Sequence, residues 1–233
     1  MLSQAVQDYL KTIYRLQTQD GVVFTSALAE AMKVTAASAT GMVKKLANLK
    51  LVRHNPYQGV VLSKIGEKAA LEIIRHHRLL ELYLAETLGY AWDQVHDEAE
   101  QLEHVISEEL EERIFEALGR PIRDPHGEPI PARDGTMRVP RHDRLSDLQP
   151  GTAGIIRQVS EPNAEMLRYL GSRGLVPDAP VKVLERAPFN GPITVELGET
   201  SHVLGRDLAS HILVQAHNRG GAVAGGRVAR SVS

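Results

Sequence analysis

The pattern of apolar and polar positions in the first part of the chain predicts three short helices followed by a small hairpin. Residues 3–17, 25–32 and 35–49 each place apolar side chains at helical spacing, and a very short turn joins the second and third of these helices. Residues 51–54 and 60–63 alternate in polarity on either side of the turn-prone NPYQG, which is typical of a small hairpin. Three helices followed by a hairpin favour a DNA-binding fold.

The rest of the chain predicts a helical domain and then a small β domain. Residues 64–89 and 93–118 carry helical periodicity, and residues 120–143 are rich in Pro, Gly and charge, as expected of an ordered loop that becomes a linker. Short β patterns then alternate with Pro/Gly turns, with one short helix at 164–172, which favours an SH3-like small β-barrel. We therefore predict a mainly α chain divided into a winged helix-turn-helix DNA-binding domain at 1–66, a helical domain with its linker at 67–143, an SH3-like domain at 144–216 and a disordered tail at 217–233.

Composition excludes several classes of protein. The chain has no cysteine, so it has no disulfide, no thiolate metal site and no cysteine nucleophile. No apolar run approaches the ~18 residues that span a bilayer, and the start has no signal-peptide pattern. We expect a soluble, cytoplasmic protein.

Charge is distributed unevenly, although the net charge is only −2. Residues 1–70 carry nine Lys/Arg against four Asp/Glu, a balance of +5, whereas residues 71–118 carry three Arg against thirteen Asp/Glu, a balance of −10. A basic first segment suits a polyanion, and an acidic second segment suits cations. Solvated helix faces would explain the same charges, so charge alone does not distinguish them from binding surfaces.

The most informative motif lies in the acidic segment. On one helix, His96, Glu100, Glu103 and His104 would share a face, and the preceding helix adds the i,i+4 pair His77 and Glu81. Imidazole and carboxylate ligands suit Mn²⁺, Fe²⁺, Co²⁺ or Zn²⁺. Alone, such a cluster is usually a solvated face. Its coincidence with a second ligand pair and a winged helix favours a metal site.

In these motifs the chain resembles the diphtheria-toxin-repressor family, and within it the manganese transport regulator branch. The segments HHRLLELYLAETLG, HDEAEQLEHVISEELEERI and GEPIP carry the resemblance, which extends over nearly the whole chain. It implies a metal-activated repressor that binds a palindromic operator as a homodimer and controls metal-homeostasis genes. Mn²⁺ is the expected co-repressor and Fe²⁺ the alternative, with Co²⁺, Zn²⁺ or Cd²⁺ as substitutes in vitro.

The resemblance also implies two metal sites. Its regulatory site comprises Asp8, Glu100, Glu103 and His104, and its ancillary site comprises His77, Glu81, His96 and Glu161, with Asn163 or Glu165 in place of a glutamine that this chain lacks. Iron-responsive members have cysteine where this chain has Glu100 and methionine where it has Asp8. Purely oxygen and nitrogen ligands favour Mn²⁺. Lys11 stands where the manganese branch often has a glutamate ligand, so a closely paired binuclear site is not expected.

The third helix of the winged helix is the expected recognition helix. Its first half carries small or hydroxyl-bearing residues, which allow close approach to DNA, and lysines that suit phosphates follow. The DNA-binding candidates are Thr35, Ala36, Ala37, Ser38, Thr40, Gly41, Lys44 and Lys45, with Tyr57 at the wing tip. Helix packing is an equal explanation for Ala36 and Ala37 individually.

The middle helices carry more apolar surface than two helices can bury alone, so we expect them to dimerise. The residues concerned are Leu79, Leu80, Tyr83, Leu84, Leu88 and Trp92. Two rival functions remain at this point. A di-metal carboxylate enzyme needs ligands from four helices, and the motifs supply two; a metal-independent DNA-binding protein would use the acidic helices for dimerisation only.

Overall fold

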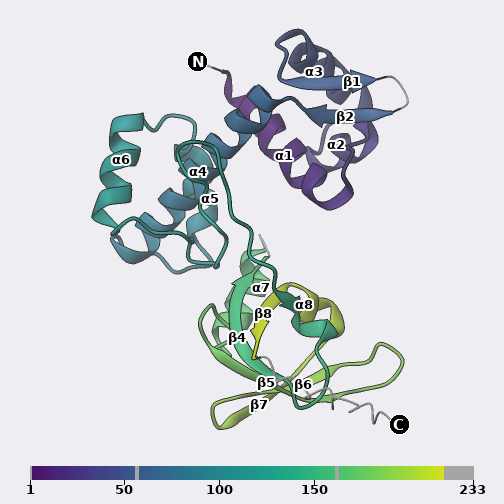
Figure 1. Ribbon diagram of the computed structural model, residues 1–233, viewed down its shortest axis with the longest axis vertical. Coiled ribbons are helices and arrows are strands. Elements are labelled where there is room, and N and C mark those ends of the chain that lie inside the picture. Colours follow the sequence, from purple (N-terminus) through teal and green to yellow (C-terminus); the bar gives the residue numbers. More distant parts are fainter. Residues whose placement is uncertain (1, 56–57, 161–162, 218–233) are drawn as a thin grey trace, which may run out of the picture. The chain divides into compact units, whose positions relative to one another are not determined.

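The computed structural model describes residues 2–55, 58–160 and 163–217 (Figure 1). The chain forms two compact units, Met1–Pro140 with Ser160–Ser172 and Arg141–Val159 with Arg173–Ser233. Two residues with predicted roles, Tyr57 and Glu161, and the predicted tail beyond His217 lie outside the described residues. Along the part of the chain that is described, no helix is long and apolar enough to cross a membrane.

The first unit begins with the predicted winged helix. It comprises α1 (Gln4–Asp20), α2 (Thr25–Ala31), α3 (Ala36–Asn48), β1 (Val52–Asn55) and β2 (Gly59–Leu62), the two strands pairing antiparallel (Figure 1). Their apolar faces meet in one core that includes Leu10, Ile13, Leu28, Leu46 and Val60. The apolar residues that recur at helical spacing in the helices and at alternate positions in the hairpin are therefore the ones that form the core.

Helix α1 runs three residues further than its apolar period predicted. Thr18 donates its hydroxyl hydrogen to the carbonyl oxygen of Tyr14 at 2.9 Å, which satisfies a polar side chain within the last turn. Gly21, with φ of 77°, then ends the helix and donates its N–H to the carbonyl of Gln17 at 2.8 Å. The polar QTQD sequence thus extends the helix on its exposed side.

Helix α4 (Lys64–Glu86) connects the winged helix to the helical part. Ser63 caps its start by accepting a hydrogen bond from the Gly66 N–H, and α4 packs against α1, α5 and α6. Gly66 lies so close to β1 that an added Cβ would be 1.9 Å from the Leu51 carbonyl oxygen. Only glycine allows the helix to leave the wing at this point.

The single helix predicted over 93–118 is wrong, because the structure has two: α5 (Val95–Leu102) and α6 (Glu108–Ala117). Ser107 starts α6 by accepting a hydrogen bond from the Leu110 N–H, so the helical pattern restarts in a new direction. Val95 and Ala99 are buried as predicted, but Leu102 and Leu110 are 40% and 50% exposed on the single chain. The break also places Glu103 and His104 beyond the end of α5 rather than on its face.

The second unit is a curled antiparallel sheet of six strands in the order β3-β8-β4-β5-β6-β7. Register shifts in the β4–β8 and β5–β6 pairings bend it, and Ile156, Val183, Val195 and Val214 are fully buried in it. Its elements are β3 (Asp143–Arg144), the 3-10 helix η1 (Leu145–Asp147), β4 (Ala153–Val159), β5 (Pro180–Arg186), β6 (Ile193–Leu197), β7 (Thr200–Leu204), α8 (Arg206–Ser210) and β8 (Ile212–Ala216). The predicted short helix, α7 (Ala164–Gly171), belongs to the first unit.

Candidate metal centre and DNA-binding surface

The first unit gathers its histidines and carboxylates into compact groups. Among the described residues, three sets of side chains each bring their ligand atoms within 4.8 Å of one another. We call them the α1 group (Asp8, Glu103 and His104), the α4 group (His77, His96 and Glu100) and the loop group (Glu81, Asp124 and His126).

The α1 group joins the winged helix to the end of α5. Asp8 Oδ1 lies 3.0 Å from His104 Nε2, and Glu103 Oε1 lies 3.5 Å from the same nitrogen. The other ring nitrogen of His104, Nδ1, lies 2.6 Å from the amide oxygen of Gln7. Since that oxygen only accepts hydrogen bonds, Nδ1 donates, and Nε2 is the ring nitrogen that faces Asp8.

Two buried polar atoms face each other in this arrangement. Asp8 Oδ1 and His104 Nε2 have no hydrogen-bond partner among the described residues, despite their 3.0 Å separation. Burial raises the pKa of Asp8, against the opposing effect of His104. Buried groups of this kind are costly unless a cation or a donor satisfies them. A divalent metal ion fits the donors that are present.

The α4 group lies beside the α1 group and shares contacts with it. His77 Nδ1 is 2.5 Å from Glu103 Oε2, and His77 Nε2 is 3.1 Å from His96 Nδ1 and 2.9 Å from Glu81 Oε1. Glu100 Oε2 lies 3.8 Å from His77 Nδ1. Burial alone would lower the pKa of His77, but the neighbouring Glu81 and Glu103 carboxylates raise it to about 9.

Two members of the loop group, Asp124 and His126, were not predicted from sequence. Glu81, Asp124 and His126 are all buried, and Glu81 Oε2 lies 3.7 Å from His126 Nδ1 while Glu81 Oε1 faces His77 and His96. Burial raises the pKa of Asp124 to about 7, and Glu81 raises that of His126 to about 9 against the effect of burial. The Asp124-Pro-His126 spacing, inside a segment interpreted as a linker, was the available signal for this group.

The structure brings most of the predicted ligands together, but it divides them into groups that differ from the two sites implied by the resemblance. Asp8, Glu103 and His104 are adjacent, whereas Glu100 groups with His77 and His96. Asn163 instead caps α7, accepting a hydrogen bond from the Met166 N–H, and Glu165 is exposed in the first turn of that helix. The ammonium of Lys11 contacts Glu100 and Glu103 at 2.7 and 2.6 Å.

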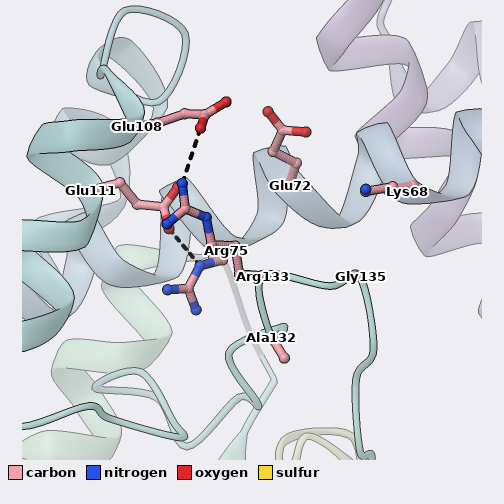
Figure 2. Close-up of a pocket in the computed structure, with 8 residues that line it drawn as sticks. All are labelled: Lys68, Glu72, Arg75, Glu108, Glu111, Ala132, Arg133 and Gly135. Atoms are coloured by element: carbon pink, nitrogen blue, oxygen red, sulfur yellow. Dashed lines mark hydrogen bonds and ion pairs between the residues drawn. The ribbon is translucent and has the colours of Figure 1, made fainter.

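A polar hollow between α4, α6 and the 132–135 loop does not resemble a ligand site (Figure 2). Two pairs of its charged side chains contact each other: Arg75 contacts Glu111 at 2.6 Å, and Arg133 contacts Glu108 at 3.1 Å (Figure 2). The hollow is lined by Lys68, Glu72, Arg75, Glu108, Glu111, Ala132, Arg133 and Gly135. We interpret it as a structural ion-pair network beside the metal-ligand groups.

The predicted DNA-binding residues lie along one side of α3. Ala39, Val43 and Leu46 face the core, which leaves the opposite side to solvent. The exposed candidates are Thr35, Ala36, Ala37, Ser38, Gly41, Lys44 and Lys45, while Thr40 is half-buried and donates its hydroxyl hydrogen to the Ala36 carbonyl at 2.7 Å. An added Cβ on Gly41 would meet none of the described residues within 4 Å, so none of them blocks close approach to the α3 backbone there.

A winged helix coupled through α1 to imidazole–carboxylate groups defines a metal-dependent DNA-binding regulator. Residues 1–60 match the N-terminal DNA-binding domain of iron dependent repressors, residues 63–132 match the metal binding and dimerisation domain of the same repressors, and residues 144–216 match the FeoA domain. The chain belongs to the iron-dependent repressor family.

Similar proteins support this assignment over nearly the full length. The iron-dependent repressor IdeR of Mycobacterium tuberculosis (strain H37Rv) is 30% identical over 226 residues, covering 92% of this chain and 98% of IdeR. A solved manganese-dependent transcriptional repressor in complex with manganese is 42% identical with a TM-score of 0.84, covering 91% of this chain and all of that one. ScaR with bound Cd²⁺ is 31% identical with a TM-score of 0.77, covering 90% and 98% of the two chains.

These matches confirm the predicted fold class and the family resemblance. The family consists of metal-dependent transcriptional repressors, which confirms that the chain is a regulator and not an enzyme. The di-metal enzyme is therefore the wrong alternative, as is a DNA-binding protein that takes no metal.

Proposed function

We propose that this chain is a manganese-activated repressor that binds a palindromic operator as a homodimer and controls genes of metal homeostasis. The observation that carries the proposal is the contact between Asp8 and His104. Asp8 lies on the first helix of the winged helix, and His104 follows α5 of the helical part. Asp8 Oδ1 and His104 Nε2, which are buried and have no hydrogen-bond partner among the residues that the structure describes, would supply ligands from both parts.

The coupling between metal and DNA follows from that placement. A divalent cation would supply the positive charge that these two atoms lack. Asp8 and His104 would then hold α1 against the end of α5, and the winged helix with it. Conformers that separate the two would lose this interaction, so metal shifts the population towards one arrangement of the DNA-reading element.

The donor set supports manganese in particular. Asp8, Glu100 and Glu103 offer carboxylate oxygens, and the histidines offer nitrogen, with no thiolate or thioether among the proposed ligands. Hard oxygen ligands bind Mn²⁺ and Fe²⁺ in preference to softer metal ions. Iron is the alternative, and the similar proteins named above include both an iron-dependent and a manganese-dependent repressor.

A second ion is proposed for the ancillary position. The shared carboxylate of Glu81 supports a site that draws on His77 and His96 on one side and on Asp124 and His126 on the other. The residues Glu161, Asn163 and Glu165 remain predicted additional ligands there. Co²⁺, Zn²⁺ or Cd²⁺ would substitute in vitro.

Dimerisation is proposed to cover apolar side chains at the end of α4 and around α5 and α6. Leu88, Leu102, Val105 and Leu110 are between 40% and 76% exposed on the single chain. The inner residues Leu79, Leu80 and Leu84 are already buried within it. A two-fold dimer presents two α3 helices and therefore requires a palindromic operator.

On each half-site, the first half of α3 would enter the major groove while Lys44 and Lys45 contact phosphates, with Tyr57 at the wing. Because its target is chromosomal DNA, we propose that the protein works in the cytoplasm. The domain limits 1–66, 67–143, 144–216 and 217–233 are part of this proposal.

The decisive experiment is operator selection followed by metal titration. Random duplexes would be selected with the full chain in Mn²⁺, and the chelator-stripped protein would then be titrated with Mn²⁺ and with Fe²⁺ under anaerobic conditions. We expect operator binding that appears with metal, disappears with chelator and favours Mn²⁺. Equal binding with and without metal would contradict the proposal, and preferential activation by Fe²⁺ would replace manganese with iron.

A further inference from the structure

The ammonium of Lys11 lies between two of the candidate metal groups. Lys11 is on α1, and its Nζ donates to Glu103 Oε1 at 2.6 Å and to Glu100 Oε2 at 2.7 Å. Glu103 belongs to the α1 group and Glu100 belongs to the α4 group. One protein cation therefore holds one carboxylate from each group.

We propose that Lys11 is a built-in competitor of the metal ion, a residue that sets how much metal the regulator needs. The inference rests on the proposed function and adds a determinant of its threshold. The Glu103 oxygen that Lys11 contacts is also the one nearest to His104 Nε2, at 3.5 Å. A metal ion bound to that oxygen would lie close to the ammonium of Lys11. Because both are positively charged, each would weaken the binding of the other to Glu103.

Burial makes this competition strong. The Glu103 side chain is fully buried and that of Lys11 is 20% exposed, so solvent screens the pair much less than it screens surface charges. Without the ammonium, Glu103 Oε1 would keep, among the described residues, only the 3.5 Å contact to His104 Nε2, since His77 contacts the other oxygen, Oε2. A buried carboxylate oxygen with so little compensation is costly. Lys11 thus stabilises the metal-free protein and opposes the metal-loaded one.

The side chain also has the means to withdraw. A lysine carries its charge on a flexible four-carbon stem, and its remaining exposure gives the ammonium access to water. Since Lys11 and Asp8 are one helical turn apart on α1, metal would exchange one contact between α1 and α5 for another. The amount of metal that the regulator needs then depends on the difference in free energy between the Lys11 contact and the metal contact.

Three variants of the full chain test the inference. Lys11→Met removes the charge and retains an unbranched side chain of similar length, whereas Lys11→Arg keeps the charge. Arg15→Met is the matched control, because it removes a cation from an exposed position of the same helix. Each chelator-stripped protein would be titrated with Mn²⁺ by calorimetry, and its Tm would be measured with chelator and with saturating Mn²⁺.

We expect Lys11→Met to bind Mn²⁺ roughly tenfold more tightly than wild type, a coupling typical of interacting sites. Its Tm should fall with chelator but not with saturating Mn²⁺, a split that general loss of packing would not produce. Lys11→Arg and Arg15→Met should keep wild-type affinity. Wild-type affinity in Lys11→Met, or an equal gain in Arg15→Met, would overturn the inference alone; a wild-type protein that binds no Mn²⁺ would overturn the proposed function as well.

Discussion

The imidazole of His76 connects the carboxylate of Glu111 to the backbone of Glu103. His76 Nε2 lies 2.9 Å from Glu111 Oε2, and His76 Nδ1 lies 3.2 Å from the Glu103 carbonyl oxygen. The other Glu111 oxygen accepts a hydrogen bond from Arg75 Nε at 2.6 Å, and Arg75 donates to the Pro131 carbonyl at 2.8 Å. One buried carboxylate on α6 therefore supports the turn that carries Glu103.

We accordingly predict that Glu111→Gln lowers the free energy of unfolding by about 3 kcal/mol, because it leaves the Arg75 charge buried without its partner. Loss of support for the Glu103 turn should also weaken Mn²⁺ binding. Urea unfolding and Mn²⁺ titration of the same protein would measure both effects. Glu112→Gln on the same helix, whose carboxylate pairs with Arg133 at an exposed position, is the control and should change neither by much.

Asp8→Ala is expected to uncouple metal from DNA. Removing the α1 ligand should weaken Mn²⁺-dependent operator binding by roughly 100-fold, at the upper end of the effect of altering a metal site. The mutant should still fold, since Asp8 Oδ1 has no hydrogen-bond partner within the described part of the chain. Gel-shift titration would measure the loss, with Asp20→Ala at the exposed end of α1 as the control. Normal metal-dependent repression by Asp8→Ala would contradict the coupling role.

Metal affinity and metal-free stability should change in opposite directions with pH. The folded-state pKa of His77 is raised from 6.5 to about 9, so its protonated form stabilises the metal-free fold fully below pH 6.5, and this contribution is lost as pH rises through 9. Metal requires the neutral ring, so binding must release a proton and tighten over the same range. The same holds for His126, with a pKa of about 9.

Calorimetry at pH 7.5 in two buffers of different ionisation enthalpy would count the protons that Mn²⁺ displaces. Thermal unfolding of the chelator-stripped protein from pH 6.5 to 9 would measure how the stability of the metal-free protein changes with pH. Identical binding enthalpies in both buffers would show that these rings are not protonated ligands.

Gly41→Ala should separate stability from DNA binding. Alanine in a helix interior is about 0.5–1 kcal/mol more stable than glycine, and the added methyl group meets nothing within 4 Å in the described part of the chain. If DNA approaches the α3 backbone at this residue, operator affinity should fall while the Tm rises. Asn48→Ala, at the far end of the same helix, should affect stability alone. Unchanged operator affinity in Gly41→Ala would place Gly41 outside the DNA interface.

Local patterns in the sequence were sufficient for the winged helix, for α4 and for the class of ligands. The apolar period of α3 defines its buried face whatever it packs against, and His77 and Glu81 share a side of α4 because they are four residues apart. The family motifs extended this to a metal-dependent repressor, which the comparisons confirm.

Tertiary structure decided how the ligands are grouped, because that depends on contacts between residues far apart in the chain. Ser107 starts a new helix, so Glu103 and His104 leave the helical face that their spacing implied. They meet Asp8, as the resemblance implied, but Glu100 groups with His77 and His96. Asp124 and His126 come from a loop with no periodicity, and only its folding against α4 brings them to Glu81. The position of the Lys11 ammonium between two carboxylates is likewise set by the packing of α1 near α5, where a buried negative charge must find a cation.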